Sequence, residues 1–391
     1  MTSTLKHVAA AGLALLLALA AGIGGRAWAV RLERKSLHTV GADLFEAKNQ
    51  GVALACEAFA TEDLLPVYGG SELGKESPHN KASLFFEKEP TGFGIFAVGM
   101  EGAMPLNLMH RLGAQGESIR GRKVVALLSP TWFLRSTVHP RFYEGNFSLM
   151  QAQAFIFNGR LDWPLRMAAA RRMLEYPETL KKRPLLRFGL ERLAGGTPLD
   201  HVLLAAAQPL AQLENAILRA QDHFEVVRYL LGQGLPPKTV FHPHLTTLDW
   251  PALLAAATRN TSTGGDANPR PERALREIEA GGDAAFREVV AGAHEWENLE
   301  LLLRTLTQLG ARPLLLSPPL NGPYMDRLGI SAEARALFYK RQRELAQRYG
   351  FPLVDFQEFE GEPKFLADRH DHPSAVGWVH YNEALNRFWH E

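Results

Sequence analysis

Five short apolar segments place the strongest limit on how this chain can fold. They span three to five residues each and are almost wholly hydrophobic: 64–68, 94–98, 124–128, 313–316 and 352–354. Continuous apolar runs, in contrast to alternating ones, are typical of strands buried on both faces of a parallel sheet. Helical patterns lie between or after them, and Ser331 and Ser374 are well placed to cap two of these helices. Alternating strands and helices predict a doubly wound α/β domain.

The segment between the third and fourth strands has a different pattern. Residues 159–311 are rich in Leu, Ala, Arg and Glu at helical spacing, for example over 210–231 and 284–309. No strong linker separates this segment from its surroundings. We therefore expect a mostly helical insert within one α/β domain that covers residues 36–391.

Charge and cysteine content exclude several classes of protein. The 391 residues contain 43 Lys and Arg against 42 Asp and Glu, a net charge of +1. This balance argues against a nucleic-acid partner, because phosphate binding needs a basic surplus. The single cysteine, Cys56, cannot form an internal disulfide, and the chain shows no Cys/His spacing typical of zinc sites. We expect neither a metal nor a cofactor.

The N-terminus carries an apolar run of a different kind. No charged residue occurs between Val8 and Gly25, and a helix of that length is about 27 Å long, close to the thickness of a bilayer's hydrocarbon core. Residues 1–35 are therefore expected to form one transmembrane anchor. A cleaved signal peptide is the alternative, because Ala27-Trp28-Ala29 matches a cleavage pattern, although Arg26 lies directly ahead of it. Basic residues on both flanks leave the orientation open.

Candidate reactive residues follow the predicted strands. In a parallel sheet, ligands bind beyond the carboxyl ends of the strands. Ser71 follows two glycines after the first strand, which favours a sharp turn with an exposed hydroxyl. Gly99 and Gly102 follow the second strand and could present an N–H group to an oxyanion. His372 precedes the last helix and could act as a general base for Ser71. Taken singly, each feature also fits a plain turn, a surface histidine or a weak metal ligand.

The order of these features resembles that of the SGNH hydrolases, in which Ser, Gly, Asn and His come from four blocks. The resemblance narrows to the DltD family, the membrane-anchored, SGNH-like proteins of cell-envelope D-alanylation. The segments that carry it are the N-terminal run, G-G-S-E-L (69–73), V-V-A-L-L-S-P-T-W-F (124–133), F-I-F-N (155–158), L-L-L-S-P-P-L-N-G (314–322), L-G-I-S-A-E-A-R (328–335), V-D-F (354–356) and H-P-S-A-V-G-W (372–378). The fold implied is an SGNH-hydrolase-like (flavodoxin-like) sheet.

The resemblance also implies roles for individual residues. Ser71 matches the family's nucleophile and His372 its C-terminal histidine, whereas Gly102 matches the oxyanion-hole glycine, with Gly99 a lesser candidate. The chain departs from the pattern at two places. Ser129-Pro130-Thr131 replaces the block-three Asn, which leaves the second oxyanion donor open. The usual acid lies three residues before the histidine, where this chain has Arg369.

Two residues are therefore candidates for the acid of the triad. Asp368 lies four residues before His372 and Asp371 one before it. An adjacent side chain seldom points at its neighbour's ring, which favours Asp368.

The function implied is Ser-His acyl transfer of D-alanine to an envelope polymer, either lipoteichoic acid or a Gram-negative glycan or lipopolysaccharide. The implied partners are a DltB-like membrane-bound O-acyltransferase, the D-alanyl carrier protein or another D-alanylated intermediate, and the acceptor polymer. The family places the main domain outside a single-pass anchor in the cytoplasmic membrane. Two alternatives share the same residues: an SGNH esterase or thioesterase, and a non-catalytic protein that docks the acyltransferase.

Overall fold

The central element of the fold is a parallel sheet of five strands. The computed structural model describes residues 3–74, 80–234, 247–261, 276–369 and 371–391. The strands are β1 (Leu64–Gly69), β2 (Gly94–Gly99), β3 (Lys123–Leu127), β4 (Arg312–Leu316) and β5 (Leu353–Val354), in the order β2-β1-β3-β4-β5. All neighbouring strands are parallel. Each apolar run thus forms a strand, and the order is the flavodoxin-like one, which confirms the predicted α/β class and is consistent with an SGNH-like fold.

Both faces of the sheet are covered, as the continuous apolar runs require. Successive strand residues point to opposite faces, so that Tyr68 of β1 enters one apolar core and Val67 enters the other. The helices that contribute to the first core include α3 (Ala53–Ala60), α5 (Pro105–Gly113), α13 (Glu295–Leu309) and α15 (Ala332–Arg348). The second core is formed with α4 (Ala82–Lys88) and α16 (Ala375–His390). The sheet is therefore doubly wound.

Two helices begin where the sequence predicted. The Ser331 side chain accepts a hydrogen bond from the Ala334 N–H at the start of α15. Ser374 does the same for the Val376 and Gly377 N–H groups at the start of α16. These bonds satisfy backbone donors that have no partner within the helix.

The chain between β3 and β4 is helical, as expected. Its helices before α13 are α6 (Arg141–Gly145), α7 (Leu149–Ile156), α8 (Trp163–Leu174), α9 (Pro184–Gly195), α10 (Pro198–Gly232), α11 (Trp250–Asn260) and α12 (Arg276–Gly292). The helix expected over 210–231 extends back to Pro198, because Thr197 and Asp200 form a capping box there. The exact limits of an insert at 159 and 311 stay a prediction.

The helical pattern over 284–309 forms two helices. The structure divides it into α12, which ends at Gly292, and α13, which begins at Glu295. The Trp296 indole N–H donates to the Val290 carbonyl at 2.7 Å, and this bond satisfies a carbonyl at the end of α12. A side-chain hydrogen bond that apolar periodicity does not encode therefore spans the break.

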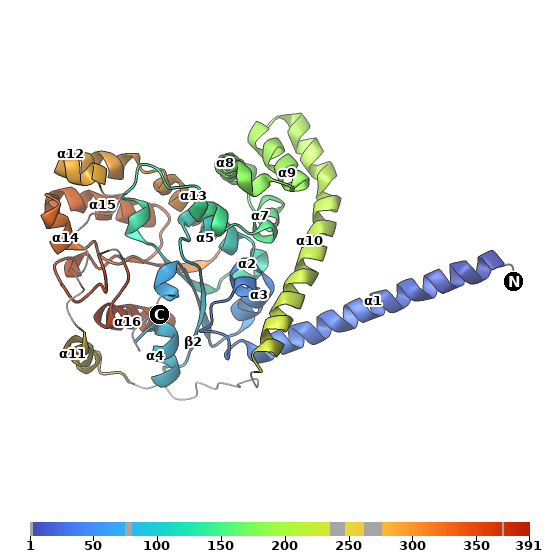
Figure 1. Cartoon of the computed structure of the whole chain (residues 1–391), viewed down its shortest axis with the longest axis horizontal. Helices are drawn as coiled ribbons and strands as arrows, with labels where there is room; N and C mark the ends of the chain where they lie inside the picture. The colour runs from blue at the N-terminus through green and yellow to red at the C-terminus, as the bar shows by residue number, and fades with distance from the viewer. Residues whose placement is uncertain (1–2, 75–79, 235–246, 262–275, 370) are drawn as a thin grey trace.

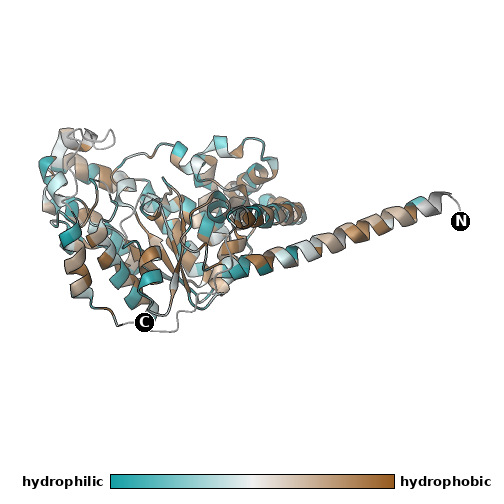
Figure 2. Ribbon diagram, turned by 60° about the horizontal axis from the view of Figure 1, so that its bottom comes forward, coloured by the Kyte–Doolittle hydropathy of each residue, from teal (hydrophilic) through white to brown (hydrophobic). Residues whose placement is uncertain are grey.

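The N-terminal run forms one long helix, α1 (Ser3–Ser36). Its outer part projects from the body of the protein (Figure 1), and Figure 2 shows mainly hydrophobic residues along this part. The segment His7–Ser36 is long and apolar enough to span a membrane, and the body of the protein covers none of its most apolar window. The shorter elements are α2 (Glu46–Gln50), α14 (Gly322–Arg327) and 3₁₀ turns that include Ser71–Leu73 and Pro130–Trp132.

Candidate functional site

Ser71 is the second residue beyond the end of β1 and the first residue of the 3₁₀ turn Ser71–Leu73. The chain can turn here because Gly69 and Gly70 have no side chains. A Cβ at Gly69 would lie only 2.3 Å from Oε1 of Glu72, and a Cβ at Gly70 would lie 3.1 Å from Oε2 of the same residue. The two glycines thus let the backbone pass close to the Glu72 carboxyl group, and the Ser71 hydroxyl stands at the carboxyl edge of the sheet.

The structure brings Ser71, His372 and Asp368 into one hydrogen-bonded chain. Ser71 Oγ lies 2.8 Å from Nε2 of His372, although 301 positions separate the two residues in the sequence. On the other side of the ring, Nδ1 of His372 lies 2.6 Å from Oδ2 of Asp368. The His372 N–H also points to Oδ1 of Asp368, at 3.4 Å. Three residues from two strand ends therefore share the arrangement of a nucleophile, a base and an orienting acid.

The hydrogen-bond chemistry of a carboxylate assigns the proton on the imidazole. An ionised carboxylate only accepts hydrogen bonds, so Nδ1 of His372 must donate to Asp368. In neutral imidazole the other nitrogen then carries a lone pair. Nε2 can therefore accept the hydroxyl proton of Ser71, which is what a general base has to do.

Asp371 occupies a separate position beside the same ring. Its Oδ2 accepts hydrogen bonds from the hydroxyls of Ser129 and Thr131, the latter at 3.1 Å. Its Oδ1 lies 3.8 Å from Nδ1 of His372. Asp371 thus connects the loop after β3 to the loop that carries His372, and Asp368 has the closer contact with the ring.

Glu72 adds a buried carboxyl group to the turn. Its Oε1 accepts the Gly70 N–H at 2.7 Å. Burial raises the pKa of Glu72 to about 7, and the nearby Asp371 charge acts in the same direction. The Gly70 N–H and His372 oppose this rise. Glu72 therefore titrates near neutral pH directly beside the candidate nucleophile.

The two glycines after β2 differ in the availability of their N–H groups. Gly99 lies opposite Gly69 in the strand register and donates its N–H to Oδ1 of Asn49 at 3.0 Å. This bond occupies the N–H that an oxyanion would need. Gly102 has a φ of +77°, and a Cβ there would lie 2.7 Å from a ring carbon of Phe142.

The loop that contains Gly102 lies beside the Ser71 turn. A Cβ on Gly70 would be 3.6 Å from the Ala103 carbonyl oxygen and 3.8 Å from that of Met100. Among the residues that the structure describes, no partner is recorded for the Gly102 N–H. Of the two glycines, Gly102 is therefore the better candidate for an oxyanion donor.

Sequence reasoning did not anticipate all of these groups. It noted Ser129 and Thr131 only as departures from a family pattern, whereas the structure uses both hydroxyls to hold Asp371. It gave no role to Glu72 or Asn49, because burial and long-range contacts are not visible in a local pattern. His370, the other histidine of this loop, lies outside the described residues. No cluster of three or more metal-binding side chains occurs among the residues described.

Comparison with known proteins adds a family match. The family model for "DltD protein" matches residues 41–390. Protein DltD of Bacillus subtilis is 23% identical over 346 residues, which cover 87% of this chain and 86% of that protein. Protein DltD of Staphylococcus aureus is 22% identical over 346 residues, with 86% and 83% covered. Protein DltD of Lacticaseibacillus rhamnosus is 23% identical over 355 residues, with 87% and 80% covered.

Proposed function

Because this chain belongs to the DltD family, whose members take part in the D-alanylation of teichoic acids, we propose that it transfers D-alanyl groups to a cell-envelope polymer through Ser71. The observation that supports this proposal most strongly is the hydrogen-bonded chain from Ser71 through His372 to Asp368. A serine with a base and an oriented acid has few structural uses other than nucleophilic catalysis.

In the first half of the reaction, Ser71 Oγ attacks the carbonyl carbon of an activated D-alanyl ester or thioester. Nε2 of His372 takes the hydroxyl proton, and the Asp368 carboxylate stabilises the imidazolium that forms. The bond to the leaving alcohol or thiol then breaks, and His372 returns the proton to the leaving oxygen or sulfur. The product is a D-alanyl ester on Ser71.

In the second half, a hydroxyl group of the acceptor polymer attacks this ester. His372 removes the acceptor proton and passes it to Ser71 Oγ as the acyl–serine bond breaks. In both halves the carbonyl oxygen becomes an oxyanion, and the Gly102 N–H is the candidate donor that stabilises it. A donor of this kind contributes about 10²–10³-fold in rate.

The family assignment suggests where the reaction takes place and with which partners. We propose that α1 anchors the protein in the cytoplasmic membrane as a single span, with the main domain outside. The D-alanyl group would come from a DltB-like membrane-bound O-acyltransferase or a D-alanyl carrier protein. The acceptor would be lipoteichoic acid or a Gram-negative glycan or lipopolysaccharide.

The side of the membrane on which the main domain lies can be tested on its own. The end of α1 next to this domain carries the basic residues Arg31, Arg34 and Lys35, which favour a cytoplasmic main domain. A reporter fused after Glu391 that is active only outside the cytoplasm should be active. Activity of a cytoplasm-specific reporter at the same position would contradict the proposed orientation.

The proposed nucleophile is tested with Ser71→Ala, which removes the attacking oxygen with little change in volume. Ester-linked D-alanine released by mild base is measured in cells that make equal amounts of each protein. Ser71→Ala should give the level of a deletion strain. Ser118→Ala is the matched control, because the Ser118 hydroxyl contacts only the Gln115 carbonyl and the Cys56 sulfur among the described residues. This control should retain wild-type release.

Two alternative functions predict other results. In an esterase or thioesterase water replaces the acceptor, so purified protein would release free D-alanine in the presence of polymer. In a non-catalytic docking protein, loss of one hydroxyl removes only about 0.5–1.5 kcal/mol of hydrogen bonding. Ser71→Ala cells would then keep much of their D-alanine, and the nucleophile assignment would be wrong.

A further inference from the structure

Among the described residues, the exposed large apolar side chains lie on two helices. Within the described part of the chain, seven such side chains lie on α1 and seven on α10. Those on α10 are between 53% and 64% exposed: Leu199, Val202, Leu210, Leu213, Ile217, Phe224 and Leu231. Soluble monomeric proteins rarely expose so many apolar side chains on one helix, and a contiguous apolar patch marks a site of interaction.

The exposed apolar side chains of α10 lie on one face of the helix, which we call the α10 stripe. Successive members are three, four, seven or eight residues apart, which returns them to the same side of a helix with 3.6 residues per turn. The buried residues of α10, such as Leu204, Ala211 and Leu230, fall on the opposite side. The α10 stripe therefore faces away from the body of the protein.

The position of α10 relates this stripe to α1. Figure 1 shows α10 at the side of the body from which α1 projects. The two helices are in contact, and Nδ1 of His223 on α10 lies 2.8 Å from Oε1 of Glu33 on α1. The stripe and the apolar part of α1 thus belong to one surface.

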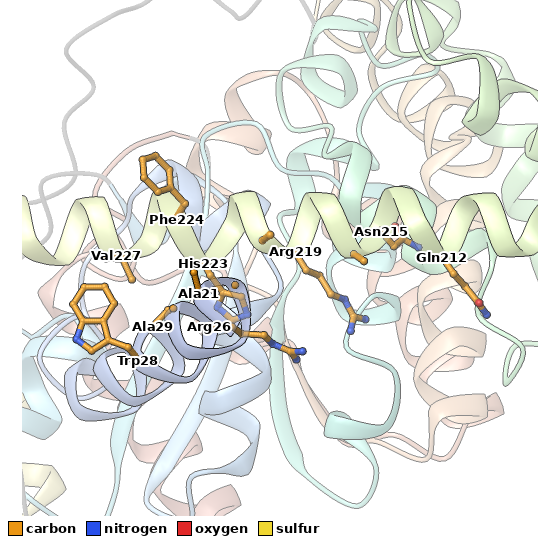
Figure 3. Close-up of a pocket in the computed structure, with 14 residues that line it drawn as sticks. Ala21, Arg26, Trp28, Ala29, Gln212, Asn215, Arg219, His223, Phe224 and Val227 are labelled. Carbon is orange, nitrogen blue, oxygen red and sulfur yellow. The ribbon is translucent and has the colours of Figure 1, made fainter. Parts of the chain in front are cut away.

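A groove lies between the two helices, next to the point where the uncharged run of α1 ends. The groove has a volume of about 630 Å³, and its walls include Gly22, Gly25 and Arg26 of α1 together with Arg219 and Phe224 of α10 (Figure 3). The uncharged run of α1 ends at Gly25 and the first charge is Arg26. If α1 spans the bilayer, α10 therefore passes α1 at the depth of the lipid headgroups.

The charged and aromatic residues of the groove fit this depth. Arg26 and Arg219 both line the groove, and neither forms a salt bridge with a carboxylate among the described residues. Trp28 is half exposed beside them. Arginine at this level binds lipid phosphate, and tryptophan is enriched at the membrane–water interface.

We propose that α10 lies along the membrane surface, with the α10 stripe in the interfacial layer and Arg26 and Arg219 in contact with lipid phosphates. The occupant of the stripe is lipid, because the apolar surface of α1 that adjoins it already requires lipid. The stripe runs from Leu199 to Leu231, a length of about 48 Å at about 1.5 Å per residue. A bilayer covers such a length without a complementary protein surface.

This proposal rests on α1 as a membrane span and is independent of the acyl-transfer chemistry. It predicts that the body of the protein is held close to the bilayer by two elements. It also predicts that the carboxyl edge of the sheet keeps a fixed orientation relative to the membrane.

The test measures the environment of single fluorophores on the full-length protein in nanodiscs of phosphatidylcholine and phosphatidylglycerol. Cys56→Ser removes the native thiol, and Leu213→Cys, Ile217→Cys and Phe224→Cys each introduce one attachment site for an environment-sensitive dye. Glu333→Cys on α15 is the matched control, because Glu333 is exposed and lies on a helix far from α1 (Figure 1). Spin-labelled lipid and aqueous iodide serve as quenchers, and nanodiscs expose both leaflets to iodide.

The three stripe positions should be quenched by spin-labelled lipid and should be at least threefold less sensitive to iodide than the Glu333 position. Equal iodide sensitivity at all four positions would overturn the proposal, because the stripe would then face water. Protection from iodide without quenching by lipid would also overturn it, because a protein surface, such as a second copy of the chain, would then cover the stripe. If one variant fails to insert, the other two still decide.

Discussion

Glu72→Gln should change the pH dependence of stability, because Glu72 is a buried acid whose pKa is raised from 4.5 to about 7. Between these two pH values the folded protein holds a proton on Glu72 that the unfolded chain has already released. Unfolding takes up no proton here but releases the one on Glu72. The contribution of Glu72 to the free energy of unfolding therefore falls as pH rises from about 4.5 to about 7 and is level above that range. The difference between a pKa of 4.5 and a pKa of about 7 corresponds to about 3 kcal/mol.

Glutamine can keep the hydrogen bond from the Gly70 N–H, since its amide oxygen is an acceptor in nearly the same place. It cannot ionise. The variant should therefore match the wild type near pH 4.5 and exceed it by up to about 3 kcal/mol at pH 8. The exposed Glu333→Gln provides the control and should follow the wild-type curve.

The measurement is urea unfolding of full-length protein in a mild detergent, followed by tryptophan fluorescence at half-unit steps between pH 4.5 and 8. The difference between variant and wild type isolates Glu72 from every other titrating group. A constant difference across this range would refute the argument, since it would mean that Glu72 binds its proton equally in both states.

Three further predictions concern the site. His372→Ala should lower the rate of hydrolysis of an activated ester such as p-nitrophenyl acetate by about 10²–10⁴-fold. The control His294→Ala, at an exposed position, should leave this rate unchanged. Equal loss in both variants would exclude His372 as the base. Asp368→Asn should lower the same rate by a similar factor while the urea midpoint moves little, because the neutral amide no longer stabilises the imidazolium; an unchanged rate would assign the acid to another residue. Gly102→Ala should lower the free energy of unfolding by about 1–3 kcal/mol, since its φ is +77° and the new Cβ would meet Phe142 at 2.7 Å; wild-type stability in urea unfolding would contradict this.

Much of the fold could be predicted because its signals are local. The buried strands appear as continuous apolar runs, and a serine at a helix start has its function within three residues. The division between α12 and α13 could not be predicted, because it depends on the bond between Trp296 and the Val290 carbonyl. The exposed face of α10 was equally hidden, since a periodic apolar pattern does not tell which of its faces the body covers.

The residues of the candidate site could be predicted in part, but the hydrogen bonds around them could not. Strand ends meet at one edge of a parallel sheet, so Ser71 and His372 could be expected together from their places in the chain. The hydrogen bonds that hold their surroundings are long-range, such as those from Ser129 and Thr131 to Asp371. The bond that occupies the Gly99 N–H comes from Asn49, which precedes it by 50 positions. No local pattern contains these pairings.

The contact between Asp368 and His372 has a structural explanation in the loop that carries both residues. This loop is closed at its base by the Leu366–Pro373 bridge and by the bond from the Ala367 N–H to the His372 carbonyl at 2.8 Å. Arg369 lies with its guanidinium 5.5 Å from the ring centre of Tyr324. Asp371 is held by the two hydroxyls after β3, which leaves the Nδ1 side of His372 to Asp368. The hydroxyl groups after β3 therefore hold Asp371, while Asp368 makes the closer contact with the imidazole ring.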